Sequence, residues 1–326
     1  MNPARPNSRL MARCMAALPA CGVGRPGAPS RAAGGGAGRP AWLVRLADYW
    51  TLTKPEVNFL VLVSTLVGFH LAARGHDDGV LLFHTLLGTL LVASGTGTLN
   101  QYIERRTDAL MRRTANRPLP AGRLQPSRAL CYGLILSAAG GAELWLAVNP
   151  FTSALALLTL GTYLLFYTPL KKQTPLCTLV GAFPGAMPPL IGWAAVRNSL
   201  SLEAWVLYAI VFLWQFPHLL AIAWMYREDY ARAGLQMLPP NDRDGRATAR
   251  QILAYTLALV PVSLIPGFLG HAGLAYLVGA GILGSAFFYC GARLAALRTN
   301  TLAKQLLLAS IAYLPLVFAL LMVDKA

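Results

Sequence analysis

The chain has 326 residues, of which 56% are hydrophobic and 13% are charged, and its mean hydropathy is positive at +0.50. This composition excludes an ordinary soluble enzyme and indicates an integral membrane protein. A net charge of +15 would suggest nucleic-acid binding by a soluble domain, but here the basic residues gather in the breaks between apolar segments, so we expect no nucleic-acid partner.

The N-terminal segment, residues 1–43, is rich in Arg, Ala, Gly and Pro, contains no acidic residue and has no apolar stretch long enough for the core of a signal peptide. We predict a disordered basic tail over 1–43 and a single domain over 44–326. A cationic, acid-poor terminus also resembles an organellar transit peptide, although such peptides usually carry more Ser and a clearer amphipathic helix. We therefore expect the bacterial inner (cytoplasmic) membrane, with the mitochondrial inner membrane as the alternative.

Nine apolar segments separated by short breaks follow this tail. Each is long enough to cross the hydrocarbon core of a bilayer as a helix. They span residues 56–74, 79–102, 128–148, 151–169, 175–196, 203–225, 249–270, 272–295 and 303–323. The sequence therefore predicts an all-α integral membrane protein with nine transmembrane helices.

The basic residues test this division into spans. If the N-terminus is cytoplasmic, the cytoplasmic segments are the stretch before the first span and residues 103–128, 170–174, 226–250 and 293–304. These segments contain 25 of the 28 Lys and Arg residues, and the exceptions are Arg74, Arg197 and Lys325. Because basic residues concentrate in cytoplasmic loops, the pattern predicts a cytoplasmic N-terminus and contact of the loops with anionic lipid of the bilayer.

A polar stripe closes the second apolar segment. Residues 79–99 contain no Asp, Glu, Lys or Arg, and Asn100, Glu104 and Asp108 then follow at intervals of four. On a helix this spacing aligns the three side chains along one face, over roughly 12 Å of axis. A carboxylate at membrane depth is costly, so such a stripe is a candidate functional site that presents three oxygen ligands to a cation. The alternative is that the helix ends at Tyr102 and the acids belong to a solvated loop.

Two cytoplasmic loops combine acids with arginines. The first, after the second span, contains Arg113, Asn116 and Arg117, the last directly before a rigid Pro-Leu-Pro. Acids beside guanidinium groups suit a polyphosphate, because carboxylates hold Mg²⁺, the metal bridges phosphate oxygens and Arg neutralises the remaining charge. The alternative is that these Arg residues only mark the cytoplasmic side.

The second loop follows the sixth span, which carries WQFPH over residues 214–218 and continues through Arg227, Glu228, Asp229 and Tyr230. Gln215 and His218 are three residues apart and share a helix face, where each needs a polar partner. That partner is either a ligand or a neighbouring helix. The acids of this loop are similarly either a second polar site or a solvated helix end.

The fourth and fifth spans carry the segments YTPLK over residues 167–171 and GAMPPLIGW over residues 185–193. Small residues and prolines allow close helix approach or a broken helix that lines a cavity. Lys171 lies on the cytoplasmic side with both acidic loops, where it is able to meet a phosphate.

These motifs together resemble the protoheme IX farnesyltransferase branch of the UbiA-type intramembrane prenyltransferases, over roughly residues 46–321. The stripe of Asn100, Glu104 and Asp108 marks the superfamily, whereas WQFPH followed by REDY over residues 227–230 is more particular to the heme branch. Two departures stand out: Glu104 occupies a position where many relatives have Asp, and Cys177 one where Asn is usual. Glu keeps the charge, so metal binding is expected to survive.

The resemblance implies a nine-helix bundle around a central cavity and the transfer of farnesyl from farnesyl diphosphate to a vinyl group of heme B, with water addition, to give heme O and diphosphate. It implies Mg²⁺ as cofactor, held by Asn100, Glu104 and Asp108, and a catalytic role for these residues and Asp229. A downstream heme-modifying enzyme or oxidase assembly proteins are the partners it suggests. The substrate-binding residues it implies are Arg113, Asn116, Arg117, Tyr167, Lys171, Trp214, Gln215, His218, Arg227 and Tyr230.

Two alternatives remain open from the sequence. One is a UbiA-type enzyme that prenylates an aromatic quinone precursor, for which more acids are expected in the second loop. The other is a membrane transporter, because intramembrane acids and prolines also fit that class. Transporter sites lie near the bilayer midplane, whereas the polar groups of this chain cluster at one membrane face.

Overall fold

The computed structural model describes residues 40–73, 78–239, 242 and 244–324. Residues 1–39, which make up most of the predicted tail, lie outside the described residues, and residues 41–43 belong to a helix. The described chain from Ala41 onward forms one compact unit. The predicted boundary between tail and domain stays a prediction.

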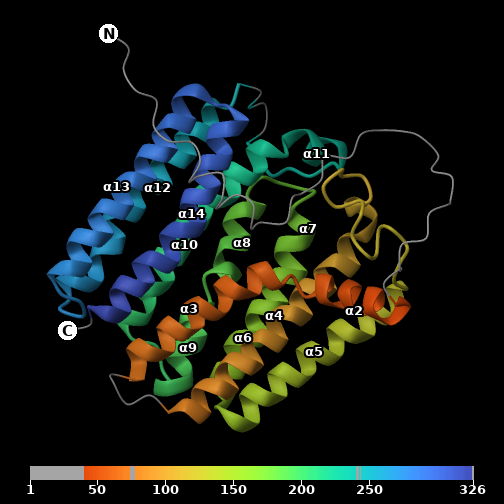
Figure 1. The fold of residues 1–326 in the computed structure, drawn as a ribbon, viewed down its shortest axis with the longest axis horizontal. Coiled ribbons are helices and arrows are strands. Elements are labelled where there is room, and N and C mark those ends of the chain that lie inside the picture. Colours follow the sequence, from red (N-terminus) through yellow and green to blue (C-terminus); the bar gives the residue numbers. More distant parts are fainter. Residues whose placement is uncertain (1–39, 74–77, 240–241, 243, 325–326) are drawn as a thin grey trace. The chain divides into compact units, whose positions relative to one another are not determined.

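Nine segments of the described residues are helical, long and apolar enough to cross a membrane, which confirms the predicted number of spans. Seven of them are single helices (Figure 1): α3 (Pro55–Ala73), α4 (Gly79–Asp108), α5 (Pro126–Ala147), α10 (Leu202–Met225), α12 (Arg246–Phe268), α13 (Leu274–Leu297) and α14 (Asn300–Val323). The fourth span is divided into α6 (Pro150–Thr162), a π-helical turn η2 (Tyr163–Tyr167) and α7 (Thr168–Leu170). The fifth is divided into α8 (Cys177–Gly185) and α9 (Pro188–Arg197). Orientation in the membrane stays a prediction.

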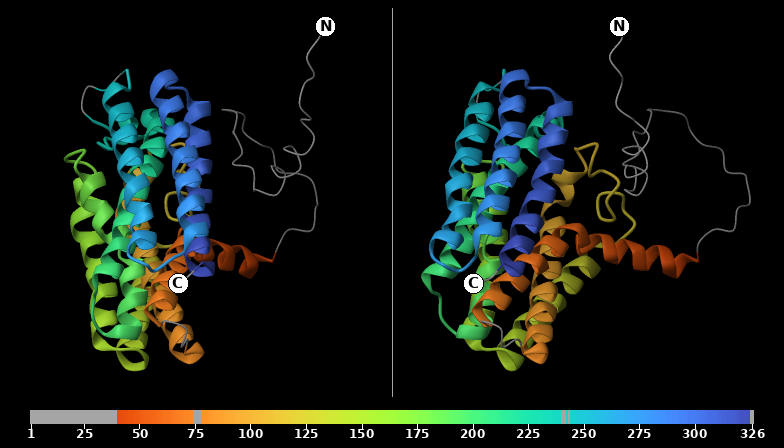
Figure 2. Two further views of the ribbon diagram at one scale, coloured as in Figure 1. Left: turned by 90° about the vertical axis from the view of Figure 1, so that its left-hand side faces the viewer. Right: turned by 60° about the vertical axis from the view of Figure 1, so that its left-hand side comes forward.

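Two short helices lie outside the spans, α2 (Ala41–Leu52) and α11 (Arg227–Arg232), and neither was predicted from the hydropathy pattern. One face of α2 carries Trp42, Leu46 and Trp50, which are 64%, 61% and 65% exposed. The opposite face is anchored, because Leu52 is fully buried against the loop between α4 and α5. α2 projects sideways from the bundle (Figure 2). Exposed Trp and Leu on one face are typical of a helix at the membrane interface.

The bundle has its largest core where α10 packs against α12 and α14, and these helices pack against α13. A smaller core joins α4, α5, α6 and α9. α10 also contacts α8 and α9, so it links the two groups of helices. The acidic end of α4 therefore belongs to one group, while α10 and the short α11 that follows it belong to the other.

α3 and α9 approach so closely that only glycine fits at their crossing. A Cβ on Gly192 would overlap the carbonyl oxygen of Thr65, and a Cβ on Gly68 would overlap the carbonyl oxygen of Pro189. Small residues at such crossings let two backbones touch, which is the main source of attraction between helices surrounded by lipid.

In both divided spans the helix is interrupted at a point where a polar side chain bonds a backbone carbonyl. In the π turn, the hydroxyl of Thr168 donates to the carbonyl of Tyr163 at 2.9 Å. Between α8 and α9, the amide of Gln215 donates to the carbonyl of Ala182 at 2.9 Å, and a Cβ on Gly185 would overlap the Gln215 side chain. Such interruptions persist inside a membrane protein because neighbouring groups satisfy the backbone.

Gly192→Ala is expected to destabilise the protein by about 1–3 kcal/mol, because the added methyl group forces α3 and α9 apart. The midpoint of thermal unfolding in detergent should fall. Gly161→Ala is the matched control, since that helical glycine has open space around its Cβ position. Equal midpoints for the two variants would contradict the close crossing.

Candidate active site

Asn100, Glu104 and Asp108 lie on the last turns of α4, which continues to Asp108. The three side chains therefore share one helix face as predicted, and the alternative that the helix ends at Tyr102 is wrong. Asn100 and Asp108 are each 1% exposed, and the side chain of Glu104 is 14% exposed. Two carboxylates this deeply buried need partners in order to stay charged.

Each of the three side chains has a cation at the same distance. Lys54 donates to the Asn100 amide oxygen at 2.8 Å, and Lys171 lies 2.8 Å from a carboxylate oxygen of Glu104. Arg117 donates to Asp108, also at 2.8 Å. These cations come from the turn between α2 and α3, from the residue after α7 and from the loop between α4 and α5. The end of α4 is therefore the point at which three other segments converge.

Lys54 was not predicted as a site residue, because in the sequence it is one of several basic residues before the first span. Lys54 occupies the turn after α2 with a left-handed φ of 54°. Gln101 holds that turn by donating to the carbonyls of Thr51 and Leu52 at 3.2 and 3.0 Å. The signal in the sequence is a lysine directly before Pro55, because a proline at the first position of a membrane helix places the residue before it at the end of that helix.

Lys54 differs from the other two cations because its partner, the amide of Asn100, is neutral. Burial, reinforced by repulsion from Arg117 and Lys171, lowers the pKa of Lys54 to about 7, and the nearby acids oppose this only in part. The cluster therefore contains one cation that no acid neutralises. A bound anion would stabilise the charged form of Lys54.

Lys171 is enclosed by aromatic rings as well as by its acid. Its ammonium lies 4.4 Å from the ring centre of Tyr167 and 6.0 Å from that of Tyr163. Burial favours the neutral amine, but Tyr167 and Glu104 outweigh it and raise the pKa of Lys171. The backbone carbonyl of Lys171 accepts from the backbone N–H of Gln236 at 2.7 Å, so the segment after α11 is bonded to this residue.

A second cluster forms around Asp229 on α11. One carboxylate oxygen accepts from the backbone amide of Arg113 at 3.2 Å, and the other accepts from Arg232 at 2.9 Å. The guanidinium of Arg113 lies 5.0 Å from the ring centre of Tyr226 and donates to the Tyr230 hydroxyl at 3.5 Å. Asp229 thus links α11 to the loop between α4 and α5, because it accepts a hydrogen bond from the Arg113 amide of that loop.

This loop joins the two clusters. Arg117 contacts Asp108, Thr114 donates to the Asp108 carbonyl at 2.8 Å, and Arg113 contacts Asp229. The acid-bearing ends of α4 and α11 therefore lie at the same end of the bundle, as the sequence predicts for two cytoplasmic loops.

The polar residues of α10 have partners on two other helices. Gln215 bonds the Ala182 carbonyl on α8. Trp214 donates to the Ser310 carbonyl on α14 at 2.8 Å, and His218 lies 2.8 Å from the Ser310 hydroxyl. Neighbouring helices thus provide the partners that Gln215 and His218 require, which was one of the two alternatives.

Two further predicted residues lie apart from the acids of α4. Arg227 donates to the Trp224 carbonyl and to the Asn300 side chain, both at 2.9 Å. Asn116 accepts at its backbone carbonyl from Arg123 at 3.1 Å. Within the described part of the chain, neither is bonded to the stripe on α4, and their substrate-binding roles stay predictions.

The donor set at the end of α4 suits magnesium. No group of three His, Cys, Asp or Glu side chains that could hold a metal is found among the described residues. Glu104 and Asp108 together offer two carboxylates, and Asn100 adds an amide oxygen. Mg²⁺ is usually held by one or two carboxylates, with water and substrate phosphates completing its shell. Two acids surrounded by three cations therefore fit a magnesium–diphosphate pair better than a metal held by protein alone.

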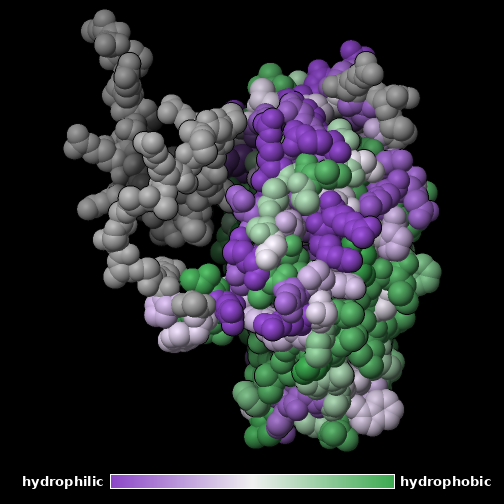
Figure 3. All heavy atoms as spheres, turned by 90° about the vertical axis from the view of Figure 1, so that its right-hand side faces the viewer, coloured by the Kyte–Doolittle hydropathy of each residue, from purple (hydrophilic) through white to green (hydrophobic). Residues whose placement is uncertain are grey.

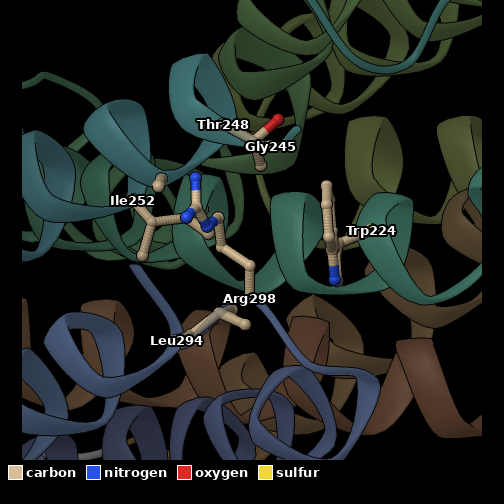
Figure 4. Close-up of a pocket in the computed structure, with 7 residues that line it drawn as sticks. Trp224, Gly245, Thr248, Ile252, Leu294 and Arg298 are labelled. Carbon is tan, nitrogen blue, oxygen red and sulfur yellow. The ribbon is translucent and has the colours of Figure 1, made fainter. Parts of the chain in front are cut away.

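The predicted central cavity stays a prediction. The hollow in Figure 4 has a cavity volume of about 10 Å³, which is room for about one water molecule. Its lining is mostly apolar and comes from α10, α12 and α13, around Trp224, Ile252 and Leu294. It is therefore separate from the acid and cation clusters.

The surface, like the interior, has its polar residues towards one end and its apolar residues over the remainder (Figure 3). On the face in Figure 3, hydrophilic residues gather over the upper part and hydrophobic residues cover the lower part. Exposed apolar side chains include Leu146 on α5 and Leu165 in the π turn, at 83% and 72% exposure. This division is expected of a protein whose spans face lipid and whose polar clusters lie at one end.

Residues 61–321 match the family model described as the UbiA prenyltransferase family. The chain is 52% identical over 289 residues to a protoheme IX farnesyltransferase of Solibacter usitatus, a match that covers 86% of this chain and 99% of that protein. It is 46% identical over 297 residues to the protoheme IX farnesyltransferase of Koribacter versatilis, covering 88% and 96%.

Solved structures share the fold. A digeranylgeranylglyceryl phosphate synthase superimposes with a TM-score of 0.69 at 17% identity and covers 86% of this chain and 98% of its own. A UbiA homologue from Archaeoglobus fulgidus, bound to GPP and Mg²⁺, superimposes with a TM-score of 0.61 at 16% identity, covering 84% and 99%. At these identities the likeness concerns the fold alone.

Lys54→Met is expected to weaken the binding of inorganic pyrophosphate with Mg²⁺ about 10- to 100-fold, since a charge-assisted hydrogen bond contributes roughly 1.5–3 kcal/mol. The change removes a cation without leaving an acid unpaired. Isothermal titration calorimetry measures the affinity, and Lys172→Met, at an exposed lysine near the same site, should leave it within about twofold. Equal affinities for the two variants would remove Lys54 from the site.

Asp229→Ala is expected to loosen residues 109–125, because the Arg113 amide loses its acceptor and Arg232 its ion pair. Hydrogen–deuterium exchange of this loop should quicken about 10- to 100-fold, corresponding to roughly 1.4–2.8 kcal/mol. Glu228→Ala, at the exposed neighbouring acid, is the control. Unchanged exchange in Asp229→Ala would show that the loop is held by other contacts.

Proposed function

The chain belongs to the UbiA prenyltransferase family, and on this premise we propose that it transfers the farnesyl group of farnesyl diphosphate to a vinyl group of heme B, with addition of water, to give heme O and diphosphate. The observation that carries this proposal is the high identity to protoheme IX farnesyltransferases over nearly their whole length. The arrangement of acids and cations at the end of α4 supports it, because it matches the chemistry of a diphosphate leaving group.

The chain's own cations act on that leaving group. As the bond between farnesyl carbon 1 and oxygen breaks, the oxygen keeps the electron pair and negative charge grows on diphosphate. Lys54, Lys171 and Arg117 are already assembled where this charge develops, so they stabilise the transition state without large rearrangement. Bound Mg²⁺ supplies Lewis-acid stabilisation and orients the diphosphate. Glu104 and Asp108, with the oxygen of Asn100, are the groups that would hold the metal.

Carbon–carbon bond formation completes the transfer. The terminal carbon of the heme vinyl group bonds to farnesyl carbon 1, and water adds to the inner vinyl carbon and loses a proton. Water must be kept from farnesyl carbon 1 until that bond has formed. Tyr167 is 8% exposed and lies directly beside Lys171, so the apolar interior begins immediately next to the phosphate-binding cations. Aromatic rings at this position also stabilise positive charge on the allylic carbon.

The location of the clusters argues against a transporter. The polar clusters lie towards the ends of spans and not at their middle. Asn100 and Asp108 are on the last turns of α4, Lys171 follows α7, and Asp229 lies just beyond α10. The high identity to protoheme IX farnesyltransferases favours heme over a quinone precursor as the acceptor.

The proposed setting is the bacterial cytoplasmic membrane, with heme O passed to a heme-modifying enzyme or to terminal oxidase assembly. The chain is a multi-pass membrane protein, and its relatives from Solibacter usitatus and Koribacter versatilis are bacterial proteins. An acceptor as apolar as heme and a donor with a farnesyl tail both reach such an enzyme through lipid.

Expression of this chain in a host that lacks its own heme O-forming enzyme is expected to yield heme O, detected by chromatography and mass spectrometry of extracted hemes. Asp108→Asn should abolish the product and the magnesium dependence of the purified enzyme, because one of two carboxylates is lost. Farnesylation of an aromatic quinone precursor with no heme O would contradict the proposed acceptor, and full activity of Asp108→Asn would contradict the proposed metal site.

A further inference from the structure

His218 is held between α10 and α14 by contacts that fix both its position and its orientation. Its ring stacks on Trp214, with centroids 5.0 Å apart and planes inclined by 28°. Trp214 in turn donates to the backbone carbonyl of Ser310, while His218 contacts the hydroxyl of the same serine. Ser310 therefore anchors both rings of the stack, and it is fully buried.

The hydrogen bonds of Ser310 determine which nitrogen of His218 carries the proton. The hydroxyl of Ser310 donates to the carbonyl of Leu307 at 2.6 Å. A hydroxyl has one proton, so in its 2.8 Å contact with His218 the serine oxygen accepts and Nδ1–H of the imidazole donates. In the neutral ring the other nitrogen, Nε2, then carries a lone pair.

This lone pair is available. Within the described residues, only Nδ1 of His218 has a hydrogen-bond partner. Nε2 has none, and it is not fully enclosed by protein atoms, so it is accessible. His218 lies roughly 10 Å along the axis of α10 from the end of that helix at Met225. A ligand of Nε2 would thus lie within the depth spanned by α10, below the end at which the phosphate-binding cations gather.

We propose that Ser310 is a positioning residue that holds His218 as the Nδ1–H tautomer, and that Nε2 of His218 binds the iron of the porphyrin acceptor. The inference rests on the proposed function, since it assumes a heme acceptor. A neutral imidazole is a good ligand for heme iron, and metal-binding histidines usually donate their other N–H to an anchoring acceptor. The contact would set the porphyrin at a fixed depth beneath the diphosphate.

Spectra of the purified full-length protein with ferric heme test the ligand. The wild type is expected to show optical and electron paramagnetic resonance spectra of imidazole-ligated iron. His218→Ala should lose this signature, and added imidazole should restore it. Unchanged spectra in His218→Ala would overturn the proposal.

Affinity measurements on Ser310 separate positioning from structural support. Ser310→Ala should weaken heme binding about 10- to 100-fold, and Ser310→Thr, which keeps the hydroxyl, should restore it. Affinity for metal-free protoporphyrin IX, followed by its fluorescence, should stay within about twofold in Ser310→Ala. Ser64→Ala, at another buried serine that bonds only its own helix, is the control and should change neither affinity.

Two outcomes would count against this role. Equal weakening of heme and protoporphyrin binding in Ser310→Ala would show that the serine supports the fold and does not position an iron ligand. The proposed function is tested separately by product: a wild-type protein that ligates heme iron through His218 but forms no heme O would overturn farnesyl transfer and leave the ligand assignment intact.

Discussion

Glu104 and Asp108 impose the requirement on which the rest of the site depends, because both are carboxylates buried at the end of a membrane helix. Removing a carboxylate from water costs several kcal/mol unless a cation and further donors compensate. The cations are Lys171 and Arg117, each at 2.8 Å. The ion pair of Asp108 therefore holds the loop between α4 and α5 against the end of α4. The ion pair of Glu104 holds the end of the fourth span beside it.

The irregular backbone of the fourth span has the same cause, because polar groups inside the membrane have no water to bond and must bond one another. The π turn lets the Thr168 hydroxyl reach the Tyr163 carbonyl, and Thr168 in turn accepts from the Asn100 amide at 3.2 Å. Asn100 thus has a partner at each end of its side chain, since its oxygen accepts from Lys54. Polar side chains and irregular backbone satisfy one another, as they must where lipid offers no hydrogen bonds.

The sequence was sufficient to predict the spans and the acidic stripe, because both depend on local patterns. Hydropathy sets the length of each span, and a spacing of four places Asn100, Glu104 and Asp108 on one face. It was not sufficient for Lys54 or Ser310, whose roles depend on contacts with residues far away in the chain. Ser310 is 92 positions from His218 and is one of many serines in apolar segments. Nothing in its neighbours distinguishes it until α10 and α14 are packed together.

The ion pairs also explain how a buried site can accept a charged ligand. Before diphosphate and magnesium bind, Lys171 and Arg117 neutralise Glu104 and Asp108. Under the proposed function, Glu104 and Asp108 would hold the metal while Lys171 and Arg117 would meet the phosphates, so every charge would exchange one partner for another and none would be left unpaired. Lys54 has no acid within hydrogen-bond distance to give up, since its partner is the neutral amide of Asn100, and an incoming anion would further stabilise its charge. The pairs thus keep the cations desolvated and in place, which is the preorganisation that a developing negative charge requires.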